Sequence, residues 1–518
     1  MGFSLLDYLV LGLYLVGITV FGALFRRSHK TAKDYFLGAK NTSWVVISVS
    51  IVATETSTLT FIGAPIIAYS HAAHPAAGGA LTFLQVVFGY VIARFVISLL
   101  FIPAYFRGEL VTAYALLDRR FGSLTKHVTA SLFLMMRPLS DGVRVFATSL
   151  VLSAVLGASF PGIPDLWFWS ILCVGVLTLI YTFEGGITAV IWTDLIQFVI
   201  YVAGALFAAY DLLQLVPGGW TTVVDRAASA NKLQLFSFTW DFTLPYTFWA
   251  GVVGGTFLTM ASHGTDQLLV QRLLTCRKER DAQKALILSG FIVLAQFALF
   301  LVIGLMLFAY YQFQPLPPIT TPDELFPAFI VRNLPHGISG LVIAAILAAA
   351  MSTLSGALNS LSSTTMADFY QPMLARRAAR EGRAVADGAL EQARLLRLSR
   401  WWTAAWGVAL IAVALVAKDW GSVLPVGLTI ASIVYGPMLG AFLLGVVTTR
   451  ANETGAIAGI VVSLTCMILV KIFTPLAWTW YVLVGTVICA AVGYAASLIT
   501  TAPLESAART MNRVAGHR

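Results

Sequence analysis

Long apolar segments recur along the whole chain, and no other feature restricts its fold as strongly. Each has about the ~20 residues that an α-helix needs to cross ~30 Å of hydrocarbon. Of the 518 residues, 58% are hydrophobic and only 11% are charged, which excludes a soluble domain of ordinary composition. We count thirteen segments, at residues 5–25, 44–69, 80–106, 128–158, 166–183, 187–213, 246–271, 284–312, 337–365, 401–417, 422–447, 455–475 and 478–498. The sequence therefore predicts an all-α membrane protein with about 13 transmembrane helices.

Positively charged residues are distributed unevenly between these segments. Cytoplasmic loops of membrane proteins carry an excess of Lys and Arg. With the N-terminus outside, the inner loops hold 25 such residues and the outer loops hold four. We therefore expect the N-terminus outside and the C-terminus inside, in the inner (plasma) membrane of the cell. Basic loops that face an anionic leaflet also account for the net charge of +9 without nucleic acid as a partner.

A cluster of uncharged hydroxyl groups lies inside the ninth segment, between Ile346 and Ser363. Ser352 and Thr353 are neighbours there, and the carbonyl of Ala349 lies about one turn earlier. Hard, neutral oxygen atoms of this kind suit an alkali cation that has lost its water. We predict that Ser352 and Thr353 bind a sodium ion. The alternative is that small hydroxylated residues let helices pack closely and bond to one another.

The second segment contains an unusual polar run, from Ala53 to Thr60, which is soon followed by Gly63 and Pro65. This pattern favours a local break in the helix, and broken helices near the membrane midplane form the ion and substrate sites of many transporters. Alternatively, the Ser and Thr side chains bond back to carbonyls one turn earlier. The run also includes Glu55, whose carboxylate has to be paired, protonated or exposed to water at that depth.

Ionisable residues inside other segments are candidates for function. Arg137, Asp141 and Arg144 lie within eight positions of the fourth segment. Asp141 and Arg144 share a helix face, so an internal ion pair is one interpretation. The other is that Arg144, nearer the middle, reaches a cavity and binds an anionic substrate. Asp194, in the sixth segment, is an intramembrane acid and therefore a further functional candidate.

The sequence contains no His cluster with metal spacing, no nucleophile elbow and no phosphate loop, and we therefore expect a transporter and not an enzyme. A channel is the other rival, but it favours a repeated pore motif, which the sequence lacks. The expected partners are a small-molecule substrate and the lipid bilayer, with no obligatory protein partner.

Two stretches resemble the signatures of a known family, the sodium:solute symporters, which include sodium/glucose, proline, sialic acid and monocarboxylate transporters. The first is GVVTTRANETGAIAGIVVS at residues 445–463, where Ser463 replaces the usual glycine. The second is YTFEGGITAVIWTD, where Ile187 replaces a more typical Leu, Met or Phe. The runs MSTLS and DQLLVQR are further matches.

The resemblance implies a LeuT-type fold with an inverted repeat, in a single transporter domain over residues 1–518. Its expected parts are an extra first helix, a first repeat, an inverted second repeat, two additional helices and a short cytoplasmic tail, at residues 5–25, 44–213, 246–447, 455–498 and 499–518.

The resemblance also implies which residues form the sodium site. These are the backbone carbonyls of Ala53, Thr56 and Ala349 and the hydroxyls of Ser352 and Thr353. Asp194 and Ser355 resemble a second sodium site or a release path, although Gly356 stands where members with that site have another hydroxyl.

For the substrate, Ser57 and Thr60 match positions that hold the carboxylate in sialic acid transporters. With Arg144, they imply sodium-coupled import, by alternating access, of a small organic anion that is a monocarboxylate or sialic-acid-like. Gln85 is a candidate for a further substrate contact, and the role of Glu55 is open. The alternative within the family is a sodium-coupled sugar or polyol symporter.

Overall fold

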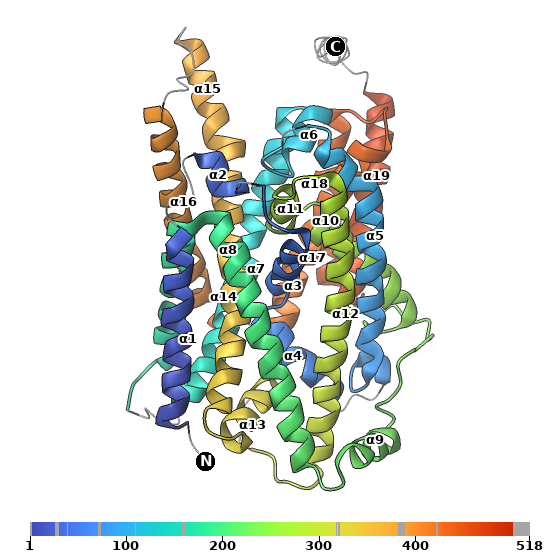
Figure 1. Cartoon of the computed structure of the whole chain (residues 1–518). Coiled ribbons are helices and arrows are strands. Elements are labelled where there is room, and N and C mark those ends of the chain that lie inside the picture. The colour runs from blue at the N-terminus through green and yellow to red at the C-terminus, as the bar shows by residue number, and fades with distance from the viewer. Residues whose placement is uncertain are drawn as a thin grey trace.

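The computed structural model describes residues 3–25, 31–38, 40–70, 74–108, 110–157, 162–317, 319, 322–381, 389–420 and 423–500. These residues form a helical bundle (Figure 1). Ten of its helices are long and apolar enough to cross a membrane, and one bent pair of helices adds an eleventh span.

Every predicted segment coincides with helical structure. The fifth and sixth segments are joined in one helix, and the seventh consists of several shorter helices. The helices concerned are α1 (Leu5–Ala23), α3 (Trp44–Glu55) with α4 (Thr58–Tyr69), α5 (Leu84–Phe106), α7 (Ser123–Gly157), α8 (Leu166–Leu215), η4 (Trp249–Gly254) with α10 (Gly255–Gly264), α12 (Glu279–Tyr310), α14 (Ile338–Thr364), α16 (Ala389–Val416), α17 (Val423–Val447), α18 (Glu453–Phe473) and α19 (Tyr481–Ile499). Shorter helices include α2 (Ala32–Leu37), α6 (Ala115–Arg120), α9 (Gly219–Ser229), α11 (Gln267–Leu274), α13 (Leu325–Asn333) and α15 (Gln371–Arg380).

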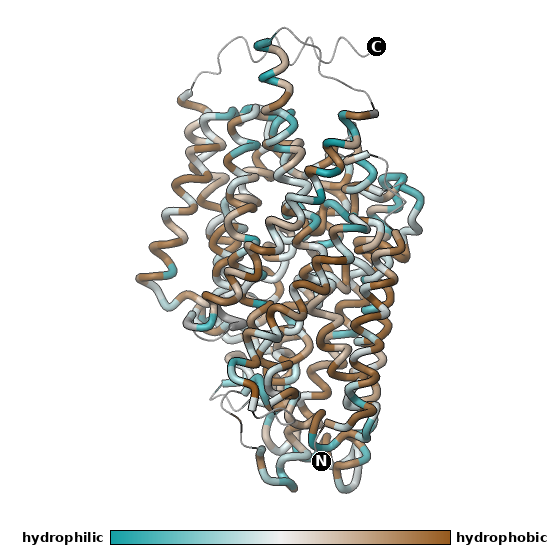
Figure 2. Tube along the Cα trace, turned by 90° about the vertical axis from the view of Figure 1, so that its left-hand side faces the viewer, coloured by the Kyte–Doolittle hydropathy of each residue, from teal (hydrophilic) through white to brown (hydrophobic). Residues whose placement is uncertain are grey.

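The first and the last long helices place the two ends of the chain at opposite ends of the bundle, as an odd number of spans requires. In Figure 1, α1 begins at the end where the N-terminus is marked, and α19 ends at the opposite end. Figure 2 shows apolar residues along the length of the helices and more polar residues near the two ends of the bundle. Apolar helices with polar ends are the pattern that a lipid bilayer requires of helices that cross it.

The helix α8 has 50 residues, so it would be about 75 Å long if it were straight, roughly twice what a membrane span needs. It bends at Gly186, whose φ is +51°. A side chain at this position would also bring its Cβ within 2.5 Å of the carbonyl oxygen of Tyr35. Glycine is therefore required for this bend, which separates the fifth and sixth predicted spans.

The predicted break in the second span is present. α3 ends at Glu55, α4 begins at Thr58, and the two helices are bent by 67°. Thr56 and Ser57 between them have extended backbone conformations. The break leaves a helix C-terminus and a helix N-terminus inside the bundle, where their unpaired backbone groups can meet ions and polar ligands.

The glycines of the seventh span allow close packing. η4 is a π-helical turn, and a Cβ on Gly251 would lie 2.8 Å from the Cβ of Gln85 at the start of α5. A Cβ on Gly255 would lie 2.6 Å from the carbonyl oxygen of Val86. The interruption of this span comes later, at Thr265 and Asp266, between α10 and α11.

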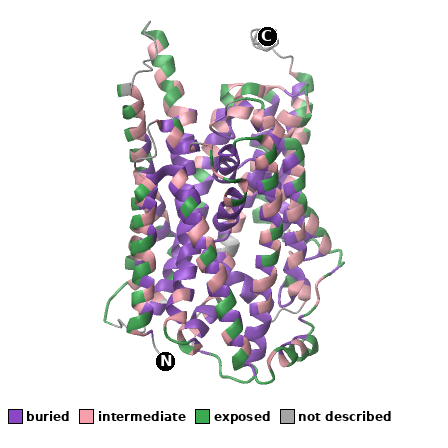
Figure 3. Ribbon diagram, viewed as in Figure 1, coloured by how far each residue is buried: buried purple, intermediate pink, exposed green. Residues whose placement is uncertain are grey.

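α14 lies in the core of the bundle. Its residues from Val342 to Thr364 are all buried, and Figure 3 shows buried residues concentrated in the centre. The carboxylate of Asp7, on α1, accepts hydrogen bonds from the backbone N–H groups of Gly337 (2.6 Å) and Gly340 (2.9 Å) at the start of this helix. An acidic side chain at a helix N-terminus is stabilising, so α1 anchors the helix that carries the predicted sodium ligands.

Candidate ion and substrate site

Oxygen atoms gather where α14 passes the break between α3 and α4. The hydroxyl oxygen of Thr353 lies 3.0 Å from the carbonyl oxygen of Thr54, 3.4 Å from that of Thr56 and 3.2 Å from that of Ala349. A hydroxyl has only one hydrogen to donate, so these oxygens have more lone pairs than this hydrogen can satisfy. A surplus of neutral oxygen acceptors is the chemistry that a desolvated alkali cation requires.

The break also changes the partner available to the carbonyl of Ala53. In an unbroken helix this carbonyl would accept a hydrogen bond from the N–H of Ser57. That N–H instead points to the hydroxyl of Thr60, at 3.4 Å. The carbonyls of Ala53 and Thr56 therefore belong to the irregular segment that the sequence predicted.

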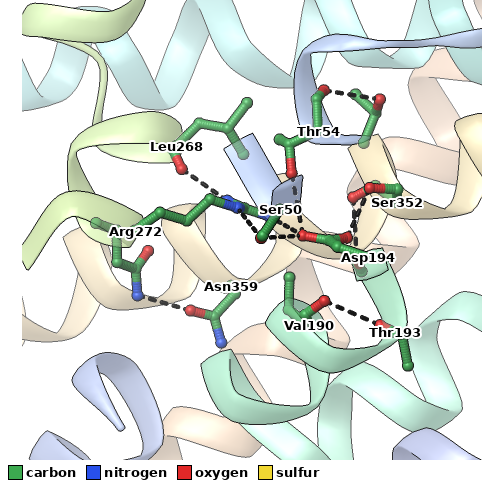
Figure 4. Close-up of polar contacts among 12 residues, drawn as sticks. Ser50, Thr54, Val190, Thr193, Asp194, Leu268, Arg272, Ser352 and Asn359 are labelled. Carbon is green, nitrogen blue, oxygen red and sulfur yellow. Dashed lines mark hydrogen bonds and ion pairs between the residues drawn. The ribbon is translucent and has the colours of Figure 1, made fainter. Parts of the chain in front are cut away.

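Ser352, the other predicted hydroxyl ligand, donates a hydrogen bond to Asp194 (2.6 Å). Asp194 is fully buried on α8 and also accepts hydrogen bonds from Ser50 (2.5 Å) and Thr54 (3.2 Å). It forms an ion pair with Arg272 at 3.0 Å (Figure 4). Helices α3, α8, α11 and α14 thus meet at one carboxylate.

Arg272 corrects one assignment made from the sequence. Arg272 is one of the 25 basic residues that the sequence analysis counted in inner loops, because it directly follows the seventh predicted segment, which ends at residue 271. The structure buries it on α11, where its Nη1 donates to the carbonyl of Leu268 (2.8 Å). The apolar residues Leu273 and Leu274 directly after it were the available signal, since they extend the buried face beyond the arginine.

The predicted second ion position contains this guanidinium. A Cβ added to Gly356 would lie 2.8 Å from Nη2 of Arg272, so the glycine makes room for the arginine. Ser355, the other residue predicted there, donates its hydroxyl to the carbonyl of Ser352 (3.0 Å) within its own helix.

A cavity of about 150 Å³ lies beside the break. Ser57 and Thr60 at the start of α4 line it, as do Arg144 and Glu55. The rest of the lining is mainly apolar and includes Phe83, Leu59, Ala64, Ile67, Leu258, Phe297 and Leu428. An apolar pocket with a few convergent polar groups is the usual form of a small-molecule site.

Of the two arginines on α7 that line the cavity, Arg144 is the more accessible. Its side chain is 22% exposed, against 4% for Arg137. Its Nη1 lies 3.3 Å from Oδ1 of Asp141, so both interpretations of the sequence apply: Arg144 forms an ion pair and also faces a cavity.

Glu55 is paired, as one of the sequence alternatives required. It forms an ion pair with Arg94, a fully buried residue of α5, and lies 3.3 Å from Nε2 of His263. The sequence analysis did not identify this cluster. The available signal was Arg94 itself, because an arginine in the middle of an apolar span needs a partner.

Gln85 is buried and bonded to backbone groups. Its Nε2 donates to the carbonyls of Thr82 (3.1 Å) and Tyr246 (2.8 Å), and its Oε1 accepts from the N–H of Ser237 (3.1 Å). It is not among the described residues that line the cavity, so the structure does not bring it together with Ser57, Thr60 and Arg144.

This combination of a broken helix, a buried hydroxylated helix and an adjoining cavity defines an ion-coupled membrane transporter. The model of the sodium:solute symporter family matches residues 35–463, so the chain belongs to that family. It is a sodium-coupled symporter with a LeuT-type all-α fold.

Similar curated proteins come from animals and bacteria. Sodium-coupled monocarboxylate transporter 2 of Mus musculus is 29% identical over 480 residues, covering 89% of this chain and 71% of its own length. The sodium/iodide cotransporter of Homo sapiens is 29% identical and covers 88% and 68%. The sodium/sialic acid symporter NanT of Aliivibrio fischeri is 29% identical over 504 residues and covers 95% and 93%.

Solved structures agree with this assignment. A Na⁺-coupled sialic acid symporter in a substrate-bound, outward-open state matches with a TM-score of 0.84 and 27% identity, over 96% of this chain and 98% of that one. The closed form of Mhp1, a nucleobase-cation-symport-1 family transporter, matches with a TM-score of 0.57 at 13% identity, which supports the fold alone.

Proposed function

We propose that this symporter imports a small organic anion, a monocarboxylate, together with sodium across the plasma membrane. The observation that carries the proposal is the guanidinium of Arg144, partly exposed in a small and mainly apolar cavity beside the start of α4. A guanidinium binds a carboxylate through charge-assisted hydrogen bonds, and a helix N-terminus adds favourable backbone N–H groups. Ser57 and Thr60 supply hydroxyls at the same end of the cavity.

Two further observations favour a small anion such as a monocarboxylate. The relatives named above are transporters of monocarboxylates, iodide and sialic acid, and all three are anionic. The cavity of about 150 Å³ is smaller than the ~300–1,000 Å³ typical of pockets for drug-sized ligands. A short monocarboxylate suits this volume better than a sialic-acid-like sugar acid does.

For the coupling ion, we propose a site made of the carbonyls of Ala53, Thr56 and Ala349 with the hydroxyls of Ser352 and Thr353. The supporting observation is the surplus of oxygen acceptors around Thr353. We propose that Asp194 and Ser355 line a release path and do not bind a second sodium, because Arg272 already compensates the charge of Asp194.

Transport then proceeds by alternating access of two inverted repeats, residues 44–213 and 246–447. Sodium bound between α14 and the α3–α4 break favours the conformation that completes the substrate site. One sodium carried with one monoanion moves no net charge, so the membrane potential contributes nothing. A tenfold sodium gradient then supports about tenfold accumulation, or ~1.4 kcal/mol.

Uptake into proteoliposomes tests this proposal. We expect saturable, sodium-dependent uptake of radiolabelled lactate or pyruvate, without a current. Arg144→Ala should raise KM about 10- to 100-fold, because a hydrogen bond to a charged group contributes ~1.5–3 kcal/mol. Arg144→Lys should lose less, and Arg394→Ala, an exposed arginine on α16, should behave as wild type.

The outcomes separate the alternatives. Unchanged KM for every transported compound in Arg144→Ala would refute the anion proposal. Sodium-dependent uptake of a neutral sugar that survives Arg144→Ala would favour the sugar or polyol symporter. Uptake that neither saturates nor depends on sodium would contradict symport.

A further inference from the structure

Asp141, on α7, is a buried acid with unused capacity to accept hydrogen bonds. Its side chain is 1% exposed, and its Oδ1 lies 3.3 Å from Nη1 of Arg137 and 3.3 Å from Nη1 of Arg144. Its Oδ2 is buried and has no hydrogen-bond partner among the described residues. A buried carboxylate oxygen left in this state is unusual and requires an explanation.

A second, small cavity of about 10 Å³ adjoins this carboxylate. Asp141 and Arg144 line it from α7, Ser57 and Thr58 from the α3–α4 break, and Thr353 from α14. Arg144, the proposed substrate residue, and Thr353, the proposed sodium ligand, therefore line the same cavity as Asp141. At about 10 Å³, this space is close to the minimum that holds one water molecule or one small ion.

The two arginines that contact Asp141 are held differently. Nη2 of Arg137 lies 2.8 Å from Oδ2 of Asp266 and 3.2 Å from the hydroxyl of Tyr435. Asp266 in turn caps α11, because its Oδ1 accepts from the N–H of Leu268 (2.8 Å). Arg137 is thus fixed between α7, α11 and α17. The ion pair of Arg144 is with Asp141 alone among the described acids, so Arg144 is the arginine that can change partners.

We propose that Asp141 is a positioning residue that couples substrate binding to sodium binding. The proposal rests on the functions proposed above for Arg144 and Thr353. Without ligands, Asp141 holds Arg144. When a substrate carboxylate binds Arg144, Asp141 loses part of its charge compensation and turns toward the small cavity beside Thr353, where a bound sodium ion stabilises it.

The same exchange works in the opposite direction. A sodium ion at Thr353 attracts the carboxylate of Asp141 and releases Arg144 for the substrate. Each ligand thereby favours the other, and thermodynamic linkage requires the two effects to be equal. Asp141 thus lies between Arg144 and the ion, and its negative charge is compensated by one or by the other.

The test is substrate affinity measured as a function of sodium concentration, by binding of radiolabelled lactate to the purified transporter. In the wild type, we expect sodium to lower the substrate Kd by a factor in the range of about 5 to 150. In Asp141→Asn, which keeps the shape and removes the charge, we expect this factor to fall toward one. We also expect tighter binding than wild type without sodium, because Arg144 no longer has an anionic competitor. General damage to the fold would weaken binding at every sodium concentration.

Asp368→Asn is the matched control. Asp368, on η6 (Thr365–Tyr370), is also a buried acid, and its partner is the hydroxyl of Thr112 (2.8 Å). It lies about four helical turns beyond Thr353 and lines neither of the two cavities. This variant should keep the wild-type sodium dependence. If Asp141→Asn does not fold, Asp141→Ala removes the charge without burying an amide group, leaves Arg137 paired with Asp266, and should show the same loss of coupling.

Failure of this inference is distinguishable from failure of the proposed function. If Arg144→Ala weakens substrate binding but the Asp141 variants keep the wild-type dependence on sodium, the coupling role is overturned. If Arg144→Ala has no effect on binding, the substrate site itself has been assigned wrongly.

Discussion

Two buried aspartates near the α3–α4 break differ in how fully their carboxylates are satisfied. Asp194 accepts hydrogen bonds from Ser50, Thr54 and Ser352 and pairs with Arg272, over distances from 2.5 to 3.2 Å. Asp141 has two contacts of 3.3 Å on one oxygen, and its other oxygen has no partner among the described residues. A fully satisfied polar network is rigid, whereas a partly satisfied one can exchange partners.

α14 contacts these two environments through adjacent residues. Ser352 donates to Asp194, while Thr353 lines the small cavity beside Asp141. Adjacent residues of an α-helix point about 100° apart. One face of α14 can therefore contact the satisfied network of Asp194, while the next face contacts the partly satisfied carboxylate of Asp141. Under the proposals above, buried charge near the ion site has two roles: the Asp194 network holds helices together, and Asp141 changes partners during transport.

The largest expected effect is on the free energy of unfolding, and it comes from the ion pair between Arg272 and Asp194. Arg272→Met leaves the carboxylate of Asp194 buried without its cation, and removing one partner of a buried ion pair costs about 3–5 kcal/mol. We expect this loss in the free energy of unfolding, measured by denaturant unfolding in detergent. Arg144→Met, at a partly exposed position, is the matched control and should cost less than ~1 kcal/mol.

Adding Asp194→Asn to Arg272→Met should restore part of the stability, since the unpaired charge is then removed. Equal stability of Arg272→Met and the wild type would contradict the view that this pair is structural.

A smaller effect is expected where Gly356 makes room for the same guanidinium. A Cβ at this position would lie 2.8 Å from Nη2 of Arg272, so Gly356→Ala should displace the arginine and cost about 1–3 kcal/mol. Thermal unfolding followed by fluorescence measures the change. Gly12→Ala on α1, where a Cβ meets no atom of the described structure within 4 Å, should be neutral or stabilising by less than ~1 kcal/mol. The same shift in both variants would mean that Gly356 has no special role.

The smallest effect on stability, but a clear one on function, is expected at Thr353. Thr353→Val keeps the shape and removes the hydroxyl that contacts the carbonyls at the break. Sodium activation of uptake should then require roughly tenfold more sodium, which corresponds to ~1.4 kcal/mol. Ser360→Ala removes a buried hydroxyl of α14 that bonds only within that helix in the described structure, and it should leave sodium activation unchanged. Wild-type sodium activation in Thr353→Val would exclude this hydroxyl as a ligand.

The sequence by itself determined the features that depend on local patterns. Apolar length predicted the spans, the uneven basic residues predicted their direction, and the polar run from Ala53 to Thr60 predicted the break that the structure contains. Ser352 and Thr353 were predicted to bind sodium because the hydroxyl cluster is visible in one segment of sequence, and this assignment stays a prediction. These signals lie within single segments and in the loops between them, so no neighbouring helix is needed to interpret them.

Which buried charges meet between different helices depends on the tertiary structure, whereas the pair of Asp141 and Arg144 within α7 was one of the interpretations of the sequence. Arg272 pairs with Asp194 across 78 positions, Arg94 pairs with Glu55 across 39, and Gln85 bonds to the backbone of Tyr246 across 161. The physical reason is that a membrane helix presents many faces of similar hydropathy, and the crossing of helices selects the face that is paired. The full set of partners of Asp194 therefore arises from packing between helices, whereas both cations that contact Asp141 lie on its own helix.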